Sequence, residues 1–193
     1  MKLTKQVFVW EDGSPKAINF ELFAKALAGE TGTDLLRGYY YICPPYQSYN
    51  PSALEVAKRT SYYTFCHSLR ELKQIELREG SIARVYDESG KPHYTQKKVD
   101  VLLAMDMLRL AMKGAVQQVV LVASDSDYIP AVKEVKAEGV KVHLYYHSSN
   151  GYAHSRELAY ECDVSHQITE GLVNQCALAK RPKRTLSLVV SRS

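Results

Sequence analysis

Short apolar runs alternate with segments of helical spacing along most of the chain. Runs rich in β-branched and aromatic residues predict strands at residues 6–10, 35–43, 82–87, 118–123, 140–146 and 164–168. Segments with apolar residues at three- and four-residue intervals predict helices at residues 18–29, 53–76, 99–114, 128–139 and 154–163. Strands that alternate with helices form βαβ units, so the pattern predicts an α/β fold with a mainly parallel sheet and helices on both faces.

The alternating pattern ends near Asn174, which predicts one folded domain over residues 1–172 and a basic tail over residues 173–193. The tail contains the cluster KRPKR (180–184) and an apolar end that forms either an added edge strand or a loose segment. A chain of 193 residues is long enough for one full hydrophobic core. The four cysteines lack the spacing of a zinc site and are predicted to be reduced thiols in that core.

The net charge of +4 permits an anionic partner such as nucleic acid without requiring one. No apolar stretch reaches the roughly 18 residues of a membrane span, and the first residues lack the apolar core of a signal peptide. We therefore expect a cytoplasmic protein without a membrane partner. The oligomeric state stays open, with a homo-oligomer as one alternative.

Acidic residues directly follow two of the predicted strands. Asp125 and Asp127 come after the strand at 118–123, and Asp12 comes after the strand at 6–10. In an open parallel sheet, ligand sites form outside the carboxyl ends of the strands. If these two strands are neighbours, the sequence predicts that the three carboxylates meet at one edge of the sheet.

Asp100, in the first turn of the helix predicted at 99–114, is a further candidate. At about 100° per residue, Asp106, Arg109 and Lys113 fall on one polar stripe, which we predict to face solvent. Asp100 lies away from that stripe, among apolar residues. Its carboxylate is expected either to cap the helix or to point into a site at the end of the sheet.

Several carboxylates close together repel one another unless a cation neutralises them. Oxygen ligands of this kind suit Mg²⁺ or Mn²⁺, which activate a water molecule and clamp a scissile phosphate in nucleases. The structural alternative is that Ser124, Asp125 or Ser126 caps the following helix. Asp12 would then lie in an ordinary turn and Asp100 beside the helix dipole. A cap needs only one short polar residue, so we favour a clustered acidic site.

Three short motifs occur in a specific order along the chain. They are an aspartate-glycine pair at 12–13, the KKVD segment at 97–100 and the SDSD turn at 124–127. Together they resemble the NYN domain family, in particular its LabA-like branch, with similarity from about Val7 to Ile168. The resemblance implies a PIN-like, Rossmann-like fold, a three-layer α/β/α sandwich, and a ribonuclease that depends on Mg²⁺ or Mn²⁺.

The resemblance also implies roles for individual residues. The catalytic and metal-binding carboxylates would be Asp12, Asp100, Asp125 and Asp127. Supporting roles would fall to Ser124, Ser126, Asn19 and Asp106. The family usually has glycine, a variable residue and asparagine after its first aspartate, whereas this chain has Gly13, Ser14 and Pro15. Because Pro15 has no side-chain amide and no backbone donor, the contact of that asparagine is either missing or supplied by Asn19.

A nuclease also needs groups that hold an anionic strand. Lys97 and Lys98 precede Asp100, and Arg156 is expected to reach the same rim, where all three cations would contact phosphates. Tyr46 and the tyrosines near it would stack on the bases of single-stranded RNA. The alternative is that these tyrosines pack in the core and in their own loop.

The leading hypothesis is a metal-dependent ribonuclease that acts on single-stranded or structured RNA. One alternative is a catalytically weak or inactive module that binds RNA or a protein partner in a regulatory role, which the change at Pro15 favours. Another is a phosphatase or nucleotide-processing enzyme that uses the same pocket. The chain has no glycine-rich phosphate loop. His143, His147 and His154 match no metal-ligand spacing and are predicted to be surface or loop residues.

Overall fold

A computed structural model of the chain describes residues 16–147 and 155–179. The helices are α1 (Phe20–Glu30), α2 (Ala53–Arg70), α3 (Val99–Met112), α4 (Ile129–Ala137), α5 (Arg156–Glu161) and α6 (Glu170–Cys176). The strands are β1 (Gly38–Ile42), β2 (Ile75–Glu79), β3 (Ser81–Tyr86), β4 (Pro92–Lys97), β5 (Gln118–Val122), β6 (Lys141–Tyr146) and β7 (Val164–Gln167). A 3₁₀ helix, η1 (Ser126–Tyr128), leads into α4.

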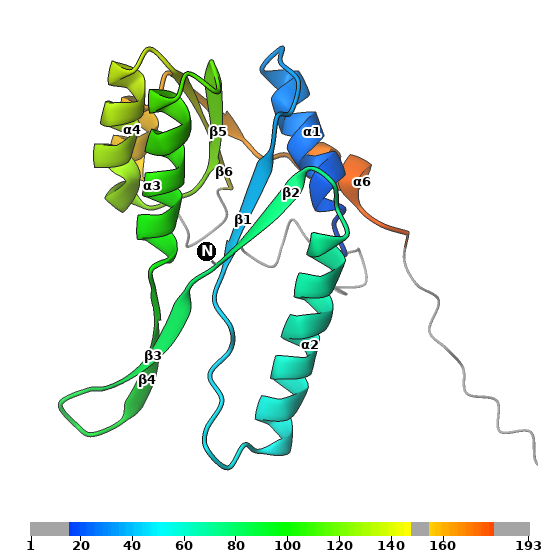
Figure 1. Cartoon of the computed structure of the whole chain (residues 1–193), viewed down its shortest axis with the longest axis vertical. Helices are drawn as coiled ribbons and strands as arrows, with labels where there is room; N and C mark the ends of the chain where they lie inside the picture. The colour runs from blue at the N-terminus through cyan, green and yellow to red at the C-terminus, as the bar shows by residue number, and fades with distance from the viewer. Residues whose placement is uncertain (1–15, 148–154, 180–193) are drawn as a thin grey trace, which may run out of the picture.

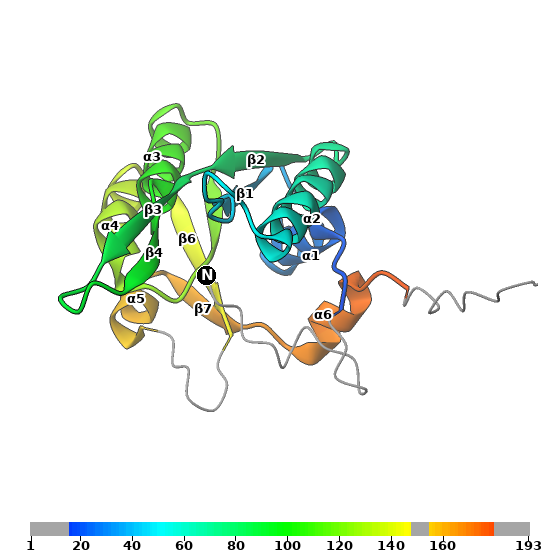
Figure 2. The same ribbon diagram turned by 90° about the horizontal axis from the view of Figure 1, so that it is seen from below.

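The strands form three small sheets (Figures 1 and 2). β5, β6 and β7 make a parallel sheet in that order, β1 pairs in parallel with β2, and β3 and β4 form an antiparallel hairpin. The α/β class and the parallel pairing are therefore confirmed. The single continuous sheet of a three-layer sandwich stays a prediction, and the strand predicted at residues 6–10 lies outside the described residues.

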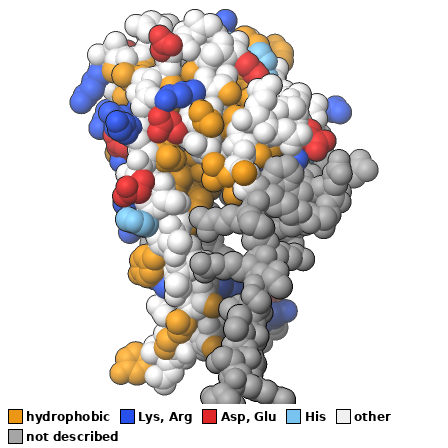
Figure 3. Space-filling model, turned by 90° about the vertical axis from the view of Figure 1, so that its right-hand side faces the viewer, with side chains coloured by type: hydrophobic (Ala, Val, Ile, Leu, Met, Phe, Trp, Pro, Cys, Tyr) orange, Lys and Arg blue, Asp and Glu red, His pale blue; other side chains and the backbone are white. Residues whose placement is uncertain are grey.

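Two elements project from the same side of the body. The β3–β4 hairpin and the first half of α2 both point downward in Figure 1, and the segment that joins β1 to α2 runs between them. Figure 3, which faces the α2 side, shows hydrophobic side chains in this lower part of the molecule. Exposed apolar residues of α2 include Leu54, Val56 and Tyr63. No helix among the described residues combines the length and hydropathy needed to cross a bilayer.

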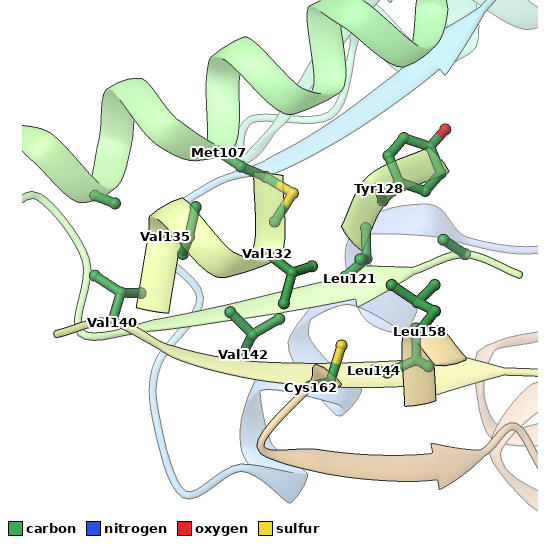
Figure 4. Close-up of a cluster of buried hydrophobic side chains, with 12 residues drawn as sticks. Met107, Leu121, Tyr128, Val132, Val135, Val140, Val142, Leu144, Leu158 and Cys162 are labelled. Carbon is green, nitrogen blue, oxygen red and sulfur yellow. The ribbon is translucent and has the colours of Figure 1, made fainter. Parts of the chain in front are cut away.

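The main core lies between the β5–β7 sheet and helices α3, α4 and α5 (Figure 4). Its fully buried members are Val132, Val135, Val142, Leu144 and Leu158. Side chains alternate between the two faces of a strand, so Val142 and Leu144 of β6 enter this core while Tyr145 points to the opposite face. Cys162 also packs here, and all four cysteines of the chain are buried and free, as predicted.

A second cluster covers the opposite face of the same sheet. Leu27 of α1 and Val173 of α6 pack with Tyr145, whose hydroxyl donates to Glu30 Oε2 at 2.8 Å. α6 spans residue 172, the predicted end of the folded domain, and its Val173 and Cys176 are buried. Packed structure therefore continues through the end of α6.

The segment after α2 differs from the prediction. The predicted helix at 53–76 ends at Arg70, and β2 begins at Ile75 because residues 75–79 pair with β1 along its whole length. Pairing with a distant strand outweighs the local helical spacing. β4 was not predicted either, because most of its side chains are exposed and it lacks an alternating apolar face.

The prediction of a surface position is wrong for His143. This residue lies on β6, is 4% exposed, and its ring stacks on that of His166 with centroids 5.8 Å apart. Neither ring nitrogen of His143 has a hydrogen-bond partner within the described residues. Burial is the main cause that lowers the pKa of His143. His147 is half-buried at the end of β6, and His154 lies outside the described residues.

Gly80 joins β2 to β3 where three segments come close together. A Cβ atom at this position would lie 2.6 Å from the Lys97 carbonyl oxygen, 2.7 Å from Val99 Cγ2 and 2.8 Å from Cys43 Sγ. One of these neighbours is backbone, so it cannot turn aside as a flexible side chain would. Gly80 therefore sets how closely the base of the hairpin packs on the start of α3.

We expect Gly80→Ala to lower the free energy of unfolding by about 1–3 kcal/mol, the usual cost of overpacking. Gly29→Ala in α1 is the matched control, because a Cβ there meets nothing within 4 Å. The control should be neutral or stabilise the protein by up to about 1 kcal/mol. Urea unfolding of both variants measures the difference. Equal stability of the two variants would contradict the close approach.

His143 should make stability depend on pH. Because its pKa is lowered in the folded protein, the unfolded chain binds the proton more readily, and stability is lost as pH falls below the unfolded value of about 6.5. His143→Phe should therefore reduce the loss of unfolding free energy between pH 7.5 and pH 5.5. His67→Phe on the exposed side of α2 serves as the control. An unchanged pH dependence in His143→Phe would contradict the buried neutral histidine.

Candidate active site

The turn after β5 presents two exposed aspartates. The Asp125 side chain accepts a hydrogen bond from the Asp127 backbone N–H at 3.1 Å and so forms the N-cap of η1. Asp125 therefore caps η1, whereas α4, the helix for which the sequence suggested a cap, has no side-chain cap of its own. Capping uses Oδ1 of Asp125, and it holds the carboxylate at the carboxyl end of β5, beyond the buried strand.

The start of α3 brings a further carboxylate to this turn. Lys98, the residue before the helix, has a left-handed backbone (φ 75°), and no side chain caps the helix there. Asp100 instead accepts a hydrogen bond at Oδ1 from the hydroxyl of Tyr128, at 2.6 Å. Asp100 therefore does not cap its own helix, and its carboxylate contacts Tyr128, the residue that follows the SDSD turn.

Tyr128 connects the acidic turn with the hydrophobic core. Its ring lies at one end of the core cluster, with the hydroxyl directed away from the neighbouring side chains (Figure 4). Burial, then the hydrogen bond to Asp100, then the negative charges of Asp100, Asp125 and Asp127 raise the pKa of Tyr128 well above its ordinary value. The hydroxyl therefore stays protonated and acts as a permanent donor. Sequence reasoning missed this residue, although it directly follows the SDSD motif.

One cavity of about 1340 Å³ includes this edge of the sheet and continues between β1 and β5. Its lining at the acidic end comprises Asp100, Ser124, Asp125, Ser126 and Ser155. Ser155 caps α5, and its backbone N–H donates to the Ser124 carbonyl at 3.2 Å. The start of α5 therefore lies beside the acidic turn. The sequence had drawn attention to Arg156 but not to Ser155.

Asp106 does not face solvent, so that part of the prediction is wrong. Its side chain is only 13% exposed and accepts hydrogen bonds from Tyr41, Arg78 and Arg109 at 3.0, 3.1 and 2.7 Å. The angular argument considered α3 alone and could not include β1 and β2, which pack against this face. Asp106 is held by cations and a phenol, which suits the structural role proposed for it.

The other predicted residues occupy different places. Asn19 is the N-cap of α1 and accepts from two backbone N–H groups. Lys97 and Lys98 link the hairpin to α3, directly before Asp100, and Arg156 is the first residue of α5. Tyr46 packs on Tyr94 of the hairpin instead of lying beside the acids.

The carboxylates offer oxygen donors that suit a hard divalent cation. Within residues 16–147 and 155–179, no group of three or more His, Cys, Asp or Glu side chains is arranged to hold a metal ion. Asp12, the remaining predicted ligand, lies outside the described residues. The candidate oxygen donors in the described part of the chain are therefore Asp100, which accepts from Tyr128, and the Asp125–Asp127 pair.

Comparisons with known proteins agree with this arrangement of elements. A search of curated proteins finds no match. The model of the NYN domain family matches residues 9–169, which includes the β5 turn, the start of α3 and α5. NYN domains are part of the PIN-like nuclease superfamily and are generally nucleases that use divalent metal ions. The chain therefore belongs to the NYN domain family.

Proposed function

We propose that this protein is a ribonuclease that depends on Mg²⁺ or Mn²⁺ and cleaves RNA at the acidic edge of its parallel strands. The observation that carries the proposal is the hydrogen bond from Tyr128 to Asp100, because it holds an acid of α3 against the acidic turn of β5. Membership of a PIN-like nuclease family supports the same reaction class. The LabA-like branch and the three-layer sandwich are parts of this proposal.

One or two of Asp100, Asp125 and Asp127 would hold the metal ion, because the three side chains are not arranged as one ligand group. Magnesium keeps several of its waters and needs only one or two protein carboxylates together with substrate phosphate oxygens, so the described donors are chemically sufficient. A bound ion would activate a water molecule and stabilise charge on the scissile phosphate. Tyr128 would orient Asp100, and the hydroxyls of Ser124 and Ser126, which line the same cavity, would orient a water or a carboxylate.

Asp12 would complete the ligand set from the strand predicted at 6–10. Among the described residues, β1 pairs only with β2 and β5 pairs only with β6, and both β1 and β5 line the large cavity between them. The strand predicted at residues 6–10 has five residues, as do β1 and β5. If the strand predicted at 6–10 is a neighbour of β5, Asp12 would reach the same edge as Asp125.

Lys97, Lys98 and Arg156 would contact RNA phosphates. Lys97 and Lys98 directly precede Asp100, and Arg156 follows Ser155, which lines the acidic end of the cavity. Phosphate contacts position a nucleic acid without reading its bases, so these residues would fix a scissile bond near the acids. Cytoplasmic RNA, single-stranded or structured, is the substrate class we propose.

A second candidate is a non-catalytic module that binds RNA in a regulatory role. Pro15 in place of the family's asparagine favours it, because proline offers neither an amide side chain nor a backbone donor. In that case the acidic turn would survive as a structural cap. The two candidates differ in turnover, not in RNA binding.

The test is cleavage of an end-labelled RNA with Mn²⁺ or Mg²⁺. We expect Asp125→Asn to lower the cleavage rate by more than about 100-fold, beyond the 10- to 100-fold typical of residues that only orient a ligand. Glu138→Gln, exposed at the opposite end of α4, should cleave like the native chain.

Cleavage without metal, or cleavage unaffected by Asp125→Asn, would contradict the proposed mechanism. RNA binding without turnover in the native chain would favour the non-catalytic module. Turnover of a small phosphate ester but not of RNA would favour a phosphatase.

A further inference from the structure

A groove separates the β3–β4 hairpin from α2. It has a volume of about 590 Å³. Its floor is formed by Cys43, Pro44 and Pro45, one wall by residues of α2 that include Lys58 and Tyr62, and the other wall by Ile82 and Gln96. The hairpin and α2, whose residues line the groove, both project from the body here (Figure 1).

One face of the hairpin carries a row of aromatic and cationic side chains. The antiparallel register places Arg84 opposite Tyr94, with Tyr86 and Ile82 on the same face because side chains alternate along a strand. The guanidinium of Arg84 lies 5.0 Å from the Tyr86 ring centroid and 5.8 Å from that of Tyr46. This face therefore turns toward the groove, where Ile82 forms part of the wall.

The rings of this row are open to solvent. Tyr86 is 57% exposed and Tyr94 is 49% exposed, although Tyr94 also packs on Tyr46 with centroids 4.6 Å apart. Aromatic rings of this size are usually buried, and exposed ones often mark a binding surface. The exposed rings here would suit a partner that has flat apolar faces. Nucleobases are such a partner, and stacking on tyrosine tolerates any base.

The charges near the groove suit a phosphate backbone. Lys58 lies on the α2 wall, Arg84 on the hairpin, and Lys97 and Lys98 at the end of β4. Of the acids at the hairpin tip, Asp87 is occupied by hydrogen bonds from Ser89 and from the Lys91 backbone. Among the described residues that line the groove, Lys58 is the one charged side chain, while Asp87 and Glu88 lie at the far tip of the hairpin.

The groove leads to the acidic site. Gln96 lines both the groove and the large cavity, and Lys97 and Lys98 connect it along the chain to Asp100. A strand that lies in the groove would thus continue toward the acids of α3 and β5.

From these observations we infer that the hairpin and α2 form a binding channel for single-stranded RNA, with bases stacked on Tyr86 and Tyr94 and phosphates paired with Lys58 and Arg84. The identity of the ligand as RNA rests on the proposed function. The channel deepens that proposal, because it assigns the substrate as a single strand that enters along the hairpin. A duplex would not offer unpaired base faces to these rings.

The test is fluorescence anisotropy of a labelled, unstructured RNA dodecamer with the full chain in EDTA, so that cleavage plays no part. Tyr86→Ala should weaken binding by about 5- to 100-fold, the effect of losing one stacked base. Tyr160→Ala, whose ring on α5 is 91% exposed, should bind like the native chain. A duplex of the same sequence should bind more weakly than the single strand.

Lys58→Gln keeps the inference testable if Tyr86→Ala disturbs the hairpin. It should weaken binding and reduce the slope of log affinity against log salt by about 0.7, as expected for one lost phosphate contact on a single strand. Native affinity in both variants, equal loss in Tyr160→Ala, or no RNA binding by the native chain would overturn the channel. If the native chain cleaves RNA while Tyr86→Ala and Lys58→Gln bind normally, only the channel fails. If the native chain binds through these residues without cleavage, only the nuclease assignment fails.

Discussion

The hydrogen bond from the Tyr128 hydroxyl to Asp100 is the contact on which the arrangement of the acidic site depends. Carboxylates that gather at one sheet edge repel one another, and each needs a donor or a cation to remain there. Tyr128 supplies a donor whose ring is fixed in the main core, and its raised pKa keeps the proton in place. The position of Asp100 is therefore tied to the packing of α3, α4 and β5, and not to a flexible loop.

The base of the hairpin joins Asp100 to the groove that we propose binds RNA. Gly80 allows the Lys97 carbonyl, Val99 and Cys43 to meet, and Lys98 turns the chain from β4 into α3 through a left-handed conformation. Asp100 follows two residues later. Because the hairpin and Asp100 share this short stretch of chain, an RNA strand bound along the hairpin would reach the acids at a defined position. The short segment of chain that joins the hairpin to Asp100 would then keep the RNA-binding groove and the acidic site at a fixed separation.

Elements with strong local patterns could be predicted from the sequence, and elements defined by distant partners could not. The apolar run of β5 and the polar turn after it were evident, as was Asp100 at the start of α3. β2 was not predicted, and the predicted helix at 53–76 ran into its first two residues, because the pairing of β2 with β1 is not a local property. Asp106 was placed toward solvent because helical angles describe one helix and not the sheet packed on it. Tyr128 was missed because a tyrosine beside an acidic motif carries no signal until its hydroxyl is seen on Asp100.

The most direct test of the account is a crystal structure of the native chain soaked with Mn²⁺, with the ion located by anomalous scattering. We expect one ion in direct contact with the carboxylates of Asp100 and Asp125, with Asp12 or Asp127 completing the protein ligands. An ion bound elsewhere, or no ion at a concentration that supports RNA cleavage, would contradict a metal site at the ends of the parallel strands.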